Sequence, residues 1–178
     1  MSRAPERIET ERLLIRRPTT ADAEAMFSRY ASDPDVTRYL SWPRQTSVDG
    51  VREFLALSDA EWQRWPAGPY LVLDRFDHTV LGGAGFFFET PLRANTGYAL
   101  ARDAWGRGIA TETLAATVAL CPSIGVVRLQ ALAHAEHRAS HRVLEKCGFV
   151  NEGVLRKHSR FPNLTDQPCD VSCFARVW

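Results

Sequence analysis

The sequence predicts a single α/β domain over residues 1–178, built on a mixed sheet of about seven strands. Three observations predict this class. The chain has 178 residues, 45% of them hydrophobic, enough for one buried core. Strand-like runs follow one another between residues 70 and 101, and strand and helix patterns alternate after that. Residues 1–10 are polar, and we expect them to form a loose surface segment.

Composition excludes several classes of function. The formal net charge is +1, so no global charge favours nucleic acid or an acidic membrane surface as a partner. No apolar run approaches the length of a membrane span, and the first residues lack the apolar core of a signal peptide. We therefore expect a cytoplasmic protein whose four cysteines stay reduced. These are Cys121, Cys147, Cys169 and Cys173.

The amino-terminal third predicts one strand and two helices. Arg12–Arg16 is the first strand, and Thr19 with Asp22 forms a capping box for a helix that ends before Pro34. A second helix follows Ser47. Its apolar face carries residues at helical spacing. They are Val51, Phe54, Leu55, Ser58, Trp62 and Trp65.

The middle of the chain predicts three strands. Tyr70–Arg75 and Thr79–Phe88 form a hairpin whose turn contains Asp77 and His78. Three glycines within the second of these strands predict a bend or bulge. Asn95–Ala101 is the third strand.

The remaining elements alternate. In order they are a helix over Trp105–Leu120, a strand over Val126–His134, a helix over His137–Cys147, and strands over Phe149–Lys157 and Asp170–Val177. Gly148 is expected to end the last helix.

The most informative segment for function is the glycine loop between a strand and a helix, Gly106-Arg107-Gly108. Unpaired N–H groups at a helix start bind phosphate, and glycine lets phosphate approach the backbone. A tight turn without ligand is the alternative. A dinucleotide site is disfavoured by the missing third glycine and by the missing acidic residue after the next strand. An ATP P-loop is excluded by the missing Lys-Ser/Thr pair.

Two motifs carry a resemblance to a known family. W-G-R-G-I-A-T-E over residues 105–112 and S-H-R-V-L-E-K-C-G-F over residues 140–149 resemble the GNAT acetyltransferases, more narrowly the RimJ/RimL type. E-R-L-L-I-R-R-P over residues 11–18, T-R-Y-L-S-W-P over residues 37–43 and Asp170 fit that type. The resemblance implies a GNAT-like α/β/α domain. Its largely antiparallel sheet would be splayed between Asn95–Ala101 and Val126–His134.

The resemblance also implies acetyl-CoA as cosubstrate and no metal. Pantetheine would pair with backbone at Ala99, Leu100 and Ala101. The pyrophosphate would lie at the loop, on or beside Trp105, Gly106, Arg107, Gly108, Ile109, Ala110 and Thr111. His137 stands where the family often has an asparagine that contacts the cofactor arm, and imidazole can also donate a hydrogen bond. The exposed edge Arg138, Arg142 and Lys146 is either a solvated face or a contact for the adenosine phosphates.

For catalysis, we expect direct transfer to a primary amine in a ternary complex. The resemblance makes Ser140 the first candidate for protonating or hydrogen-bonding the leaving sulfur, with Tyr98 second. Many relatives carry glutamate where this chain has Asn95-Thr96, so Glu89 or His134, acting directly or through water, is the candidate base. Each also has a purely structural interpretation: a solvated strand-end charge for Glu89, a hydrogen-bonded histidine for His134, and packing for Ser140 and Tyr98.

The acceptor is open between a protein N-terminus and an amine-bearing small molecule. Its wall is expected to include Tyr39–Arg44, Trp62, Trp65 and the loop Ser159–Pro168, although these aromatics suit a core equally. The alternatives in function are a non-catalytic acyl-CoA-binding sensing module and a structural interaction domain. The family resemblance is compatible with a homodimer. Zinc on His137, His141, Cys169 and Cys173 is disfavoured by the missing Cys-x-x-Cys spacing.

Overall fold

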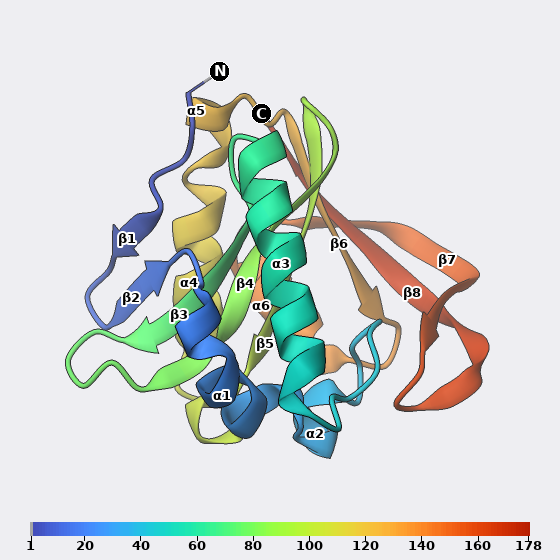
Figure 1. The fold of residues 1–178 in the computed structure, drawn as a ribbon. Helices are drawn as coiled ribbons and strands as arrows, with labels where there is room; N and C mark the ends of the chain where they lie inside the picture. The colour runs from blue at the N-terminus through green and yellow to red at the C-terminus, as the bar shows by residue number, and fades with distance from the viewer. Residues whose placement is uncertain (1) are drawn as a thin grey trace.

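The computed structural model describes residues 2–178 and contains one sheet of eight strands, in the order β1-β2-β3-β4-β5-β6-β8-β7 (Figure 1). All neighbouring pairs are antiparallel except β5 and β6, which are parallel. The predicted mixed α/β architecture is confirmed, with one strand more than expected. The strands are β1 (Arg7–Glu9), β2 (Leu13–Arg16), β3 (Pro69–Asp74), β4 (Val80–Thr90), β5 (Arg93–Leu100), β6 (Arg128–His134), β7 (Val150–Phe161) and β8 (Thr165–Val177).

Helices cover both faces of the sheet. Figure 1 shows α3 in front of it with α1 and α2 near its lower end, and α4 and α6 behind. The helices are α1 (Ala23–Met26), α2 (Pro34–Thr37), α3 (Val48–Arg64), α4 (Ile109–Val118), α5 (Cys121–Ile124) and α6 (Arg138–Lys146). Shorter turns are the 3-10 segments η1 (Thr20–Asp22) and η3 (Arg102–Ala104) and the π segment η2 (Phe27–Ala31).

The amino-terminal segment is better ordered than predicted. Residues 7–9 form β1, which pairs with β2 through Ile8 and Ile15. Ala4 is buried, and the Tyr70 hydroxyl donates a hydrogen bond of 2.8 Å to the carbonyl of Pro5. The prediction of a loose segment over residues 1–10 is therefore wrong for this part. A three-residue edge strand with mostly exposed side chains is too short to produce a hydrophobic period.

The first predicted helix forms as three short pieces, η1, α1 and η2. The Asp22 carboxylate accepts from the Thr19 N–H at 2.7 Å, as the capping box predicts. At the other end, the Asp33 carboxylate accepts from the Asp35 N–H at 2.8 Å and caps α2. The Asp33-Pro34 pair thus ends one helical segment and begins another.

The predicted helix over residues 105–120 begins later and ends earlier than expected. Gly106 and Gly108 have φ of +71° and +78°, left-handed values that cannot continue a helix, so α4 starts at Ile109. It ends at Val118, and the separate helix α5 follows, with Pro122 in its first turn. The helix α6 ends at Lys146, and Gly148, two residues later, has a φ of +78°, which confirms the predicted stop.

The feature that creates a site is the separation of β5 from β6. Only three residue pairs join them, and the last is Asn95 with Gln130. β5 then runs on to Leu100 paired only with β4, while β6 runs on to His134 paired only with β8. The sheet is therefore splayed between the two predicted strands.

The core lies on both sides of the sheet. One cluster packs α4, α5 and α6 against it, and a second packs α1 and α3. Beyond the core, β7 and β8 continue as a long hairpin that projects at the right of Figure 1. The end of this hairpin comes back into the site described next.

Candidate active site

The open edge of β5 offers backbone groups to a ligand, but not at all three predicted residues. The Ala101 N–H donates to Leu81 at 2.8 Å, and the Ala101 carbonyl accepts from Ala104 at 3.0 Å, so both groups are used internally. The Ala99 carbonyl points at Gly82 of β4. Because neighbouring residues of a strand point to opposite edges, Leu100 faces the opening. Of the three predicted residues, Leu100 is therefore the one whose backbone groups face the opening, and its carbonyl also accepts from the Trp105 indole at 2.8 Å.

The glycine loop presents a row of unpaired amides beside that edge. No acceptor among residues 2–178 engages the N–H groups of residues 106–111. A Cβ at Gly106 would meet no atom within 4 Å, and at Gly108 it would meet only the Arg12 guanidinium, at 3.5 Å. The loop therefore has open space above its amides and the positive end of the α4 dipole behind them, which together suit a phosphate.

Arg12, in the loop before β2, stabilises the glycine loop through hydrogen bonds. Its guanidinium donates to the Arg107 carbonyl at 2.9 Å and to the Glu112 carboxylate at 2.7 Å. Thr10 donates to the same carboxylate at 2.5 Å. Partial burial raises the pKa of Glu112, but the hydrogen bonds from Thr10 and Arg12 outweigh it, so the pKa lies below its ordinary value. Glu112 stays ionised and ties α4 to the amino-terminal segment.

Tyr98 and Ser140, the two predicted proton donors, lie together across the opening. The Tyr98 hydroxyl on β5 and the Ser140 Oγ on α6 are 3.1 Å apart and hydrogen-bonded. Burial raises the pKa of Tyr98 to about 12, although the bond to Ser140 opposes the shift. The phenol is therefore protonated throughout the neutral range, and the pair has a proton to donate.

Glu89, the predicted base, lies where β5 and β6 part. Its carboxylate accepts from the Asn95 side chain at 2.6 Å and the Gln130 side chain at 3.0 Å, and pairs with Arg93 at 2.7 Å. A carboxylate has about four acceptor sites, so one remains for a water or an amine. Side chains alternate along β5, so Asn95 and Tyr98 lie on opposite faces. The candidate base and the candidate acid thus flank the opening from opposite faces.

His134, the other predicted base, is buried and already hydrogen-bonded. Its Nδ1 accepts from the Glu136 N–H at 3.2 Å, so a neutral ring carries its proton on Nε2. Neither nitrogen of that tautomer is free to accept a proton from an amine. The ring packs against Tyr39 and edge-on against Phe161, at centroid distances of 5.0 and 4.9 Å. These contacts favour the structural interpretation of His134.

His137, predicted to contact the cofactor arm, is the residue that precedes α6. Its ring stacks on Tyr39 with centroids 4.7 Å apart. Burial, assisted by the neighbouring His141 and His134, lowers the pKa of His137 to about 4. The imidazole is therefore neutral at physiological pH, able to donate one hydrogen bond and accept another.

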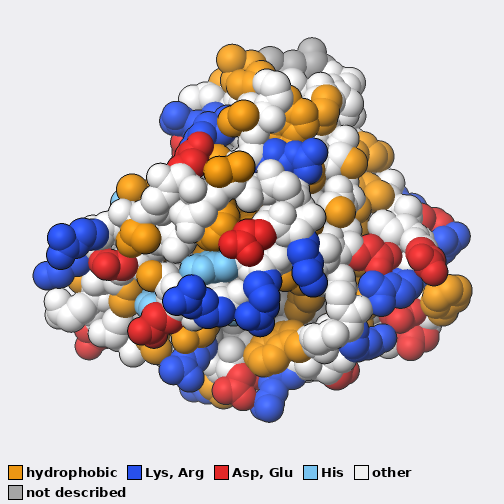
Figure 2. Space-filling view, turned by 180° about the vertical axis from the view of Figure 1, so that it is seen from behind, with side chains coloured by type: hydrophobic (Ala, Val, Ile, Leu, Met, Phe, Trp, Pro, Cys, Tyr) orange, Lys and Arg blue, Asp and Glu red, His pale blue; other side chains and the backbone are white. Residues whose placement is uncertain are grey.

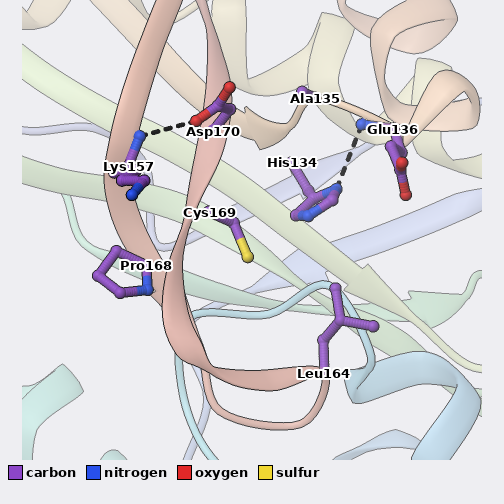
Figure 3. A pocket seen from close by; sticks show the side chains of 8 residues that line it. All are labelled: His134, Ala135, Glu136, Lys157, Leu164, Pro168, Cys169 and Asp170. Carbon is purple, nitrogen blue, oxygen red and sulfur yellow. Dashed lines mark hydrogen bonds between the residues drawn. The ribbon is translucent and has the colours of Figure 1, made fainter.

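A cavity of about 430 Å³ opens beside His134, between the β6–α6 loop and the β7–β8 hairpin (Figure 3). Figure 3 shows the His134 ring and the Cys169 sulfur directed toward the same space, with Leu164 below them. Its walls are His134, Ala135, Glu136, Lys157, Leu164, Pro168, Cys169 and Asp170. The loop Ser159–Pro168, predicted to form part of an acceptor wall, contributes two of these residues.

Asn163 joins that loop to the other predicted wall segment, Tyr39–Arg44. Its side-chain amide donates to the carbonyls of Thr37 and Trp42 at 2.8 and 2.9 Å, and its oxygen accepts from the Arg44 N–H at 2.7 Å. One side chain therefore fixes two loops more than 100 positions apart in sequence.

Of the two tryptophans predicted for the wall, Trp62 lies in α3 and Trp65 directly follows its last residue. Trp62 is 1% exposed, with its indole donating to the Pro69 carbonyl at 2.8 Å. Trp65 stacks on Phe88 at a centroid distance of 5.3 Å. The prediction that Trp62 lines the acceptor site is wrong, because the face of α3 that carries it packs in the core, whereas Trp65 is half-buried. For Trp62, the helical spacing therefore indicated the core and not a ligand.

Basic side chains gather on the face that carries α4 and α6. Figure 2 shows this face from behind, with several Lys and Arg side chains around a histidine near its centre. Exposed Arg107, Arg138, Arg142 and Lys146 have no carboxylate within ion-pairing distance among residues 2–178. Unpaired cations close to free amides favour an anionic ligand with several charges.

Cys121 and Cys147 are buried, as predicted, whereas Cys169 and Cys173 are half-buried. Within the described residues no group of three or more His, Cys, Asp or Glu side chains is arranged to hold a metal ion. In residues 2–178, no helix combines the length and the apolarity that crossing a bilayer requires.

Several residues of the site carry no sequence signal strong enough to assign them. Arg12 lies in a recognised motif, but its partner Glu112 is 100 positions away. Asn163 and Lys157 lie in polar stretches, a pattern that predicts solvent-exposed segments. The polar pair Asn95 and Gln130 could have been noticed only by pairing two strands that are distant in sequence.

The acetyltransferase (GNAT) domain model matches residues 12–150. The uncharacterized N-acetyltransferase YoaA of Bacillus subtilis (strain 168) is 30% identical over 173 residues, 96% of each chain. A GNAT-family acetyltransferase from Bacillus anthracis superposes with a TM-score of 0.83 at 25% identity, covering 96% of this chain and 98% of that one. The RimL ribosomal L7/L12 alpha-N-protein acetyltransferase, solved with coenzyme A, superposes with a TM-score of 0.86 at 22% identity, covering 97% and 98%.

Proposed function

The chain belongs to the GNAT acetyltransferase family, and from that premise we propose that it transfers the acetyl group of acetyl-CoA to a primary amine within a ternary complex. The observation that carries the proposal is the splayed sheet. An opening between β5 and β6 adjoins a loop with unpaired amides on one side and a cavity on the other. Two substrates can therefore approach one point from opposite faces.

The residues around the opening fit acetyl-CoA, which when bound supplies an activated acetyl group as a thioester. The unpaired N–H groups of residues 106–111 would hold the pyrophosphate, and Arg107 adds a cation. Leu100 presents backbone groups to the pantetheine arm, with His137 as a further donor. Exposed Arg138, Arg142 and Lys146 suit the adenosine phosphates.

Tyr98 and Ser140 are proposed as the groups that protonate the departing thiolate. Their hydrogen bond lets Ser140 donate to sulfur while Tyr98 donates to Ser140, or lets Tyr98 donate directly. Either arrangement matches the protonated state of a phenol with its pKa raised to about 12. Positioning two reactants at one point supplies the larger share of the acceleration, about 7–11 kcal/mol in well-oriented systems.

Glu89 is proposed as the base, through a water held at its remaining acceptor site. Three donors fix the carboxylate where the strands part and leave one acceptor site for that water. His134 is the weaker candidate, because its Nδ1 is engaged. The acceptor is an amine on a protein N-terminus or on a small molecule, entering by the cavity beside His134.

The test is calorimetric titration with acetyl-CoA, followed in the same preparation by thiol release against a panel of amines and N-terminal peptides. Tight binding with release for at least one amine class is the expected result. Binding without release for any amine would favour the acyl-CoA-sensing alternative. A folded protein that does not bind acetyl-CoA contradicts the proposal.

A further inference from the structure

The β7–β8 hairpin is interrupted where it borders the cavity. Leu155 pairs with Val171 and Ser159 pairs with Cys169, so three residues of β7 face the single residue Asp170. Such a bulge redirects side chains and is common beside active sites. At its centre Lys157 has φ of +48°, a left-handed conformation that is unfavourable for lysine.

Asp170 holds this conformation in place. Its Oδ1 accepts from the Lys157 N–H at 2.8 Å, as Figure 3 shows. The Asp170 carbonyl accepts from the Ala135 N–H at 3.1 Å, which ties the bulge to the β6–α6 loop beside His134. Strain that the surrounding structure maintains at a cavity wall indicates that the position of the side chain matters.

The charges around the cavity define what it can bind. Lys157 lines it and has no carboxylate within ion-pairing distance among residues 2–178. The wall also contains the carboxylates of Glu136 and Asp170 and the imidazole of His134. Carboxylates attract the ammonium form of an amine, and an unpaired lysine attracts an anion.

We propose that Lys157 is a specificity-determining residue that binds an anionic group, carboxylate or phosphate, placed close to the amine of the acceptor. Asp170 is its positioning residue. This inference rests on the proposed acetyl transfer and narrows its acceptor class. It favours amines that carry a nearby negative charge, on a peptide or on a small molecule, over polyamines and neutral amines.

The test compares matched acceptors at saturating acetyl-CoA. One pair is the tetrapeptide amides Ser-Asp-Ala-Ala and Ser-Asn-Ala-Ala, and the small-molecule pair is β-alanine and β-alaninamide. We expect kcat/KM about tenfold higher for the charged member of at least one pair, the size of one charge-assisted hydrogen bond. The pair that responds identifies the source of the anion.

Three variants separate recognition from structure. In Lys157→Asn the asparagine tolerates the left-handed conformation and lacks the charge. The ratio of kcat/KM for the charged acceptor to that for the neutral one should therefore fall to about one, without a lower melting temperature. Lys157→Arg should retain the ratio. Arg160→Asn, on β7 outside the cavity wall, should leave it unchanged.

Equal kcat/KM for both members of each pair, or a ratio that survives in Lys157→Asn, overturns the inference. So does thiol release with other amines of the panel but with neither pair. These results leave the acetyltransferase proposal standing, because acetyl-CoA binding and release with other amines are measured separately. A melting temperature lowered in Lys157→Asn would mean that lysine serves the fold.

Discussion

The two sides of the β5–β6 opening differ in how they are assembled. The proposed cofactor side comes mainly from one continuous segment, β5 followed by the glycine loop and the start of α4, with residues 137–146 adding a histidine and three cations. Most of its proposed binding groups are backbone amides. The proposed acceptor side comes from separate segments, including residues 37–44, the β6–α6 loop and the β7–β8 hairpin, and its proposed binding groups are side chains. A backbone site tolerates changes of side chain, whereas a site made of side chains can change its substrate by single substitutions.

The largest effect is expected from placing charge on the cofactor side. Asn and Asp both tolerate the left-handed conformation of Gly108, so Gly108→Asn and Gly108→Asp differ mainly in charge. We expect Gly108→Asp to weaken acetyl-CoA binding by at least about 100-fold, roughly 2.7 kcal/mol, because a carboxylate would lie beside the pyrophosphate. Gly108→Asn should lose much less affinity for acetyl-CoA. Equal affinities in calorimetry would show that the phosphates lie elsewhere.

The next effect concerns the chemistry between the two sides. Ser140→Ala and Tyr98→Phe should each lower kcat by roughly 10- to 100-fold, below the range of a fully lost general acid because the partner hydroxyl remains. In the double variant, kcat should fall by less than the product of the two single fold reductions, because the two hydroxyl groups act as a unit. A larger change in acetyl-CoA affinity than in kcat would make them binding residues.

A smaller effect is expected on the acceptor side. Asn163→Asp keeps the acceptor for the Arg44 N–H and removes both donors, to Thr37 and Trp42. We expect KM for the amine to rise about five- to twelvefold, from about 1–1.5 kcal/mol of lost hydrogen bonding, with acetyl-CoA affinity unchanged. The measurement is steady-state kinetics at saturating acetyl-CoA. Weakened acetyl-CoA binding in this variant would break the separation of the two sides.

The smallest expected effect is on folding stability at low pH, and it concerns His137, which lies between the two sides. The folded pKa of about 4 is below the ordinary 6.5, so between these values the unfolded chain binds more protons and stability falls as pH is lowered. His137→Asn removes this dependence. Its stability relative to the wild type should therefore increase on acidification, by about 1 kcal/mol at pH 4.5 after allowance for partial solvent access. Parallel stability curves from pH 7 to 4.5 would contradict the burial of this imidazole.

The same difference between the two sides explains what could be predicted from sequence. The strands, α3, α6 and the glycine loop follow from local pattern, since periodicity and φ-permissive glycines are read within a few residues. The β1 strand was missed because it is short and exposed. Lys157 and Asn163 were missed because their roles depend on partners that only the folded chain brings close. Trp62 was misassigned because a wall residue and a core residue have the same helical spacing.

The most direct test of the central claim, that backbone amides of the glycine loop hold the cofactor, is a ¹H–¹⁵N correlation spectrum recorded during titration with acetyl-CoA. We predict the largest shifts at the amides of Gly106, Gly108, Ile109 and Ala110, with Leu100 also affected. Amides of β1 and of the β7 bulge at Lys157 should move little. Large shifts confined to the cavity beside His134, with the glycine loop unmoved, would contradict it.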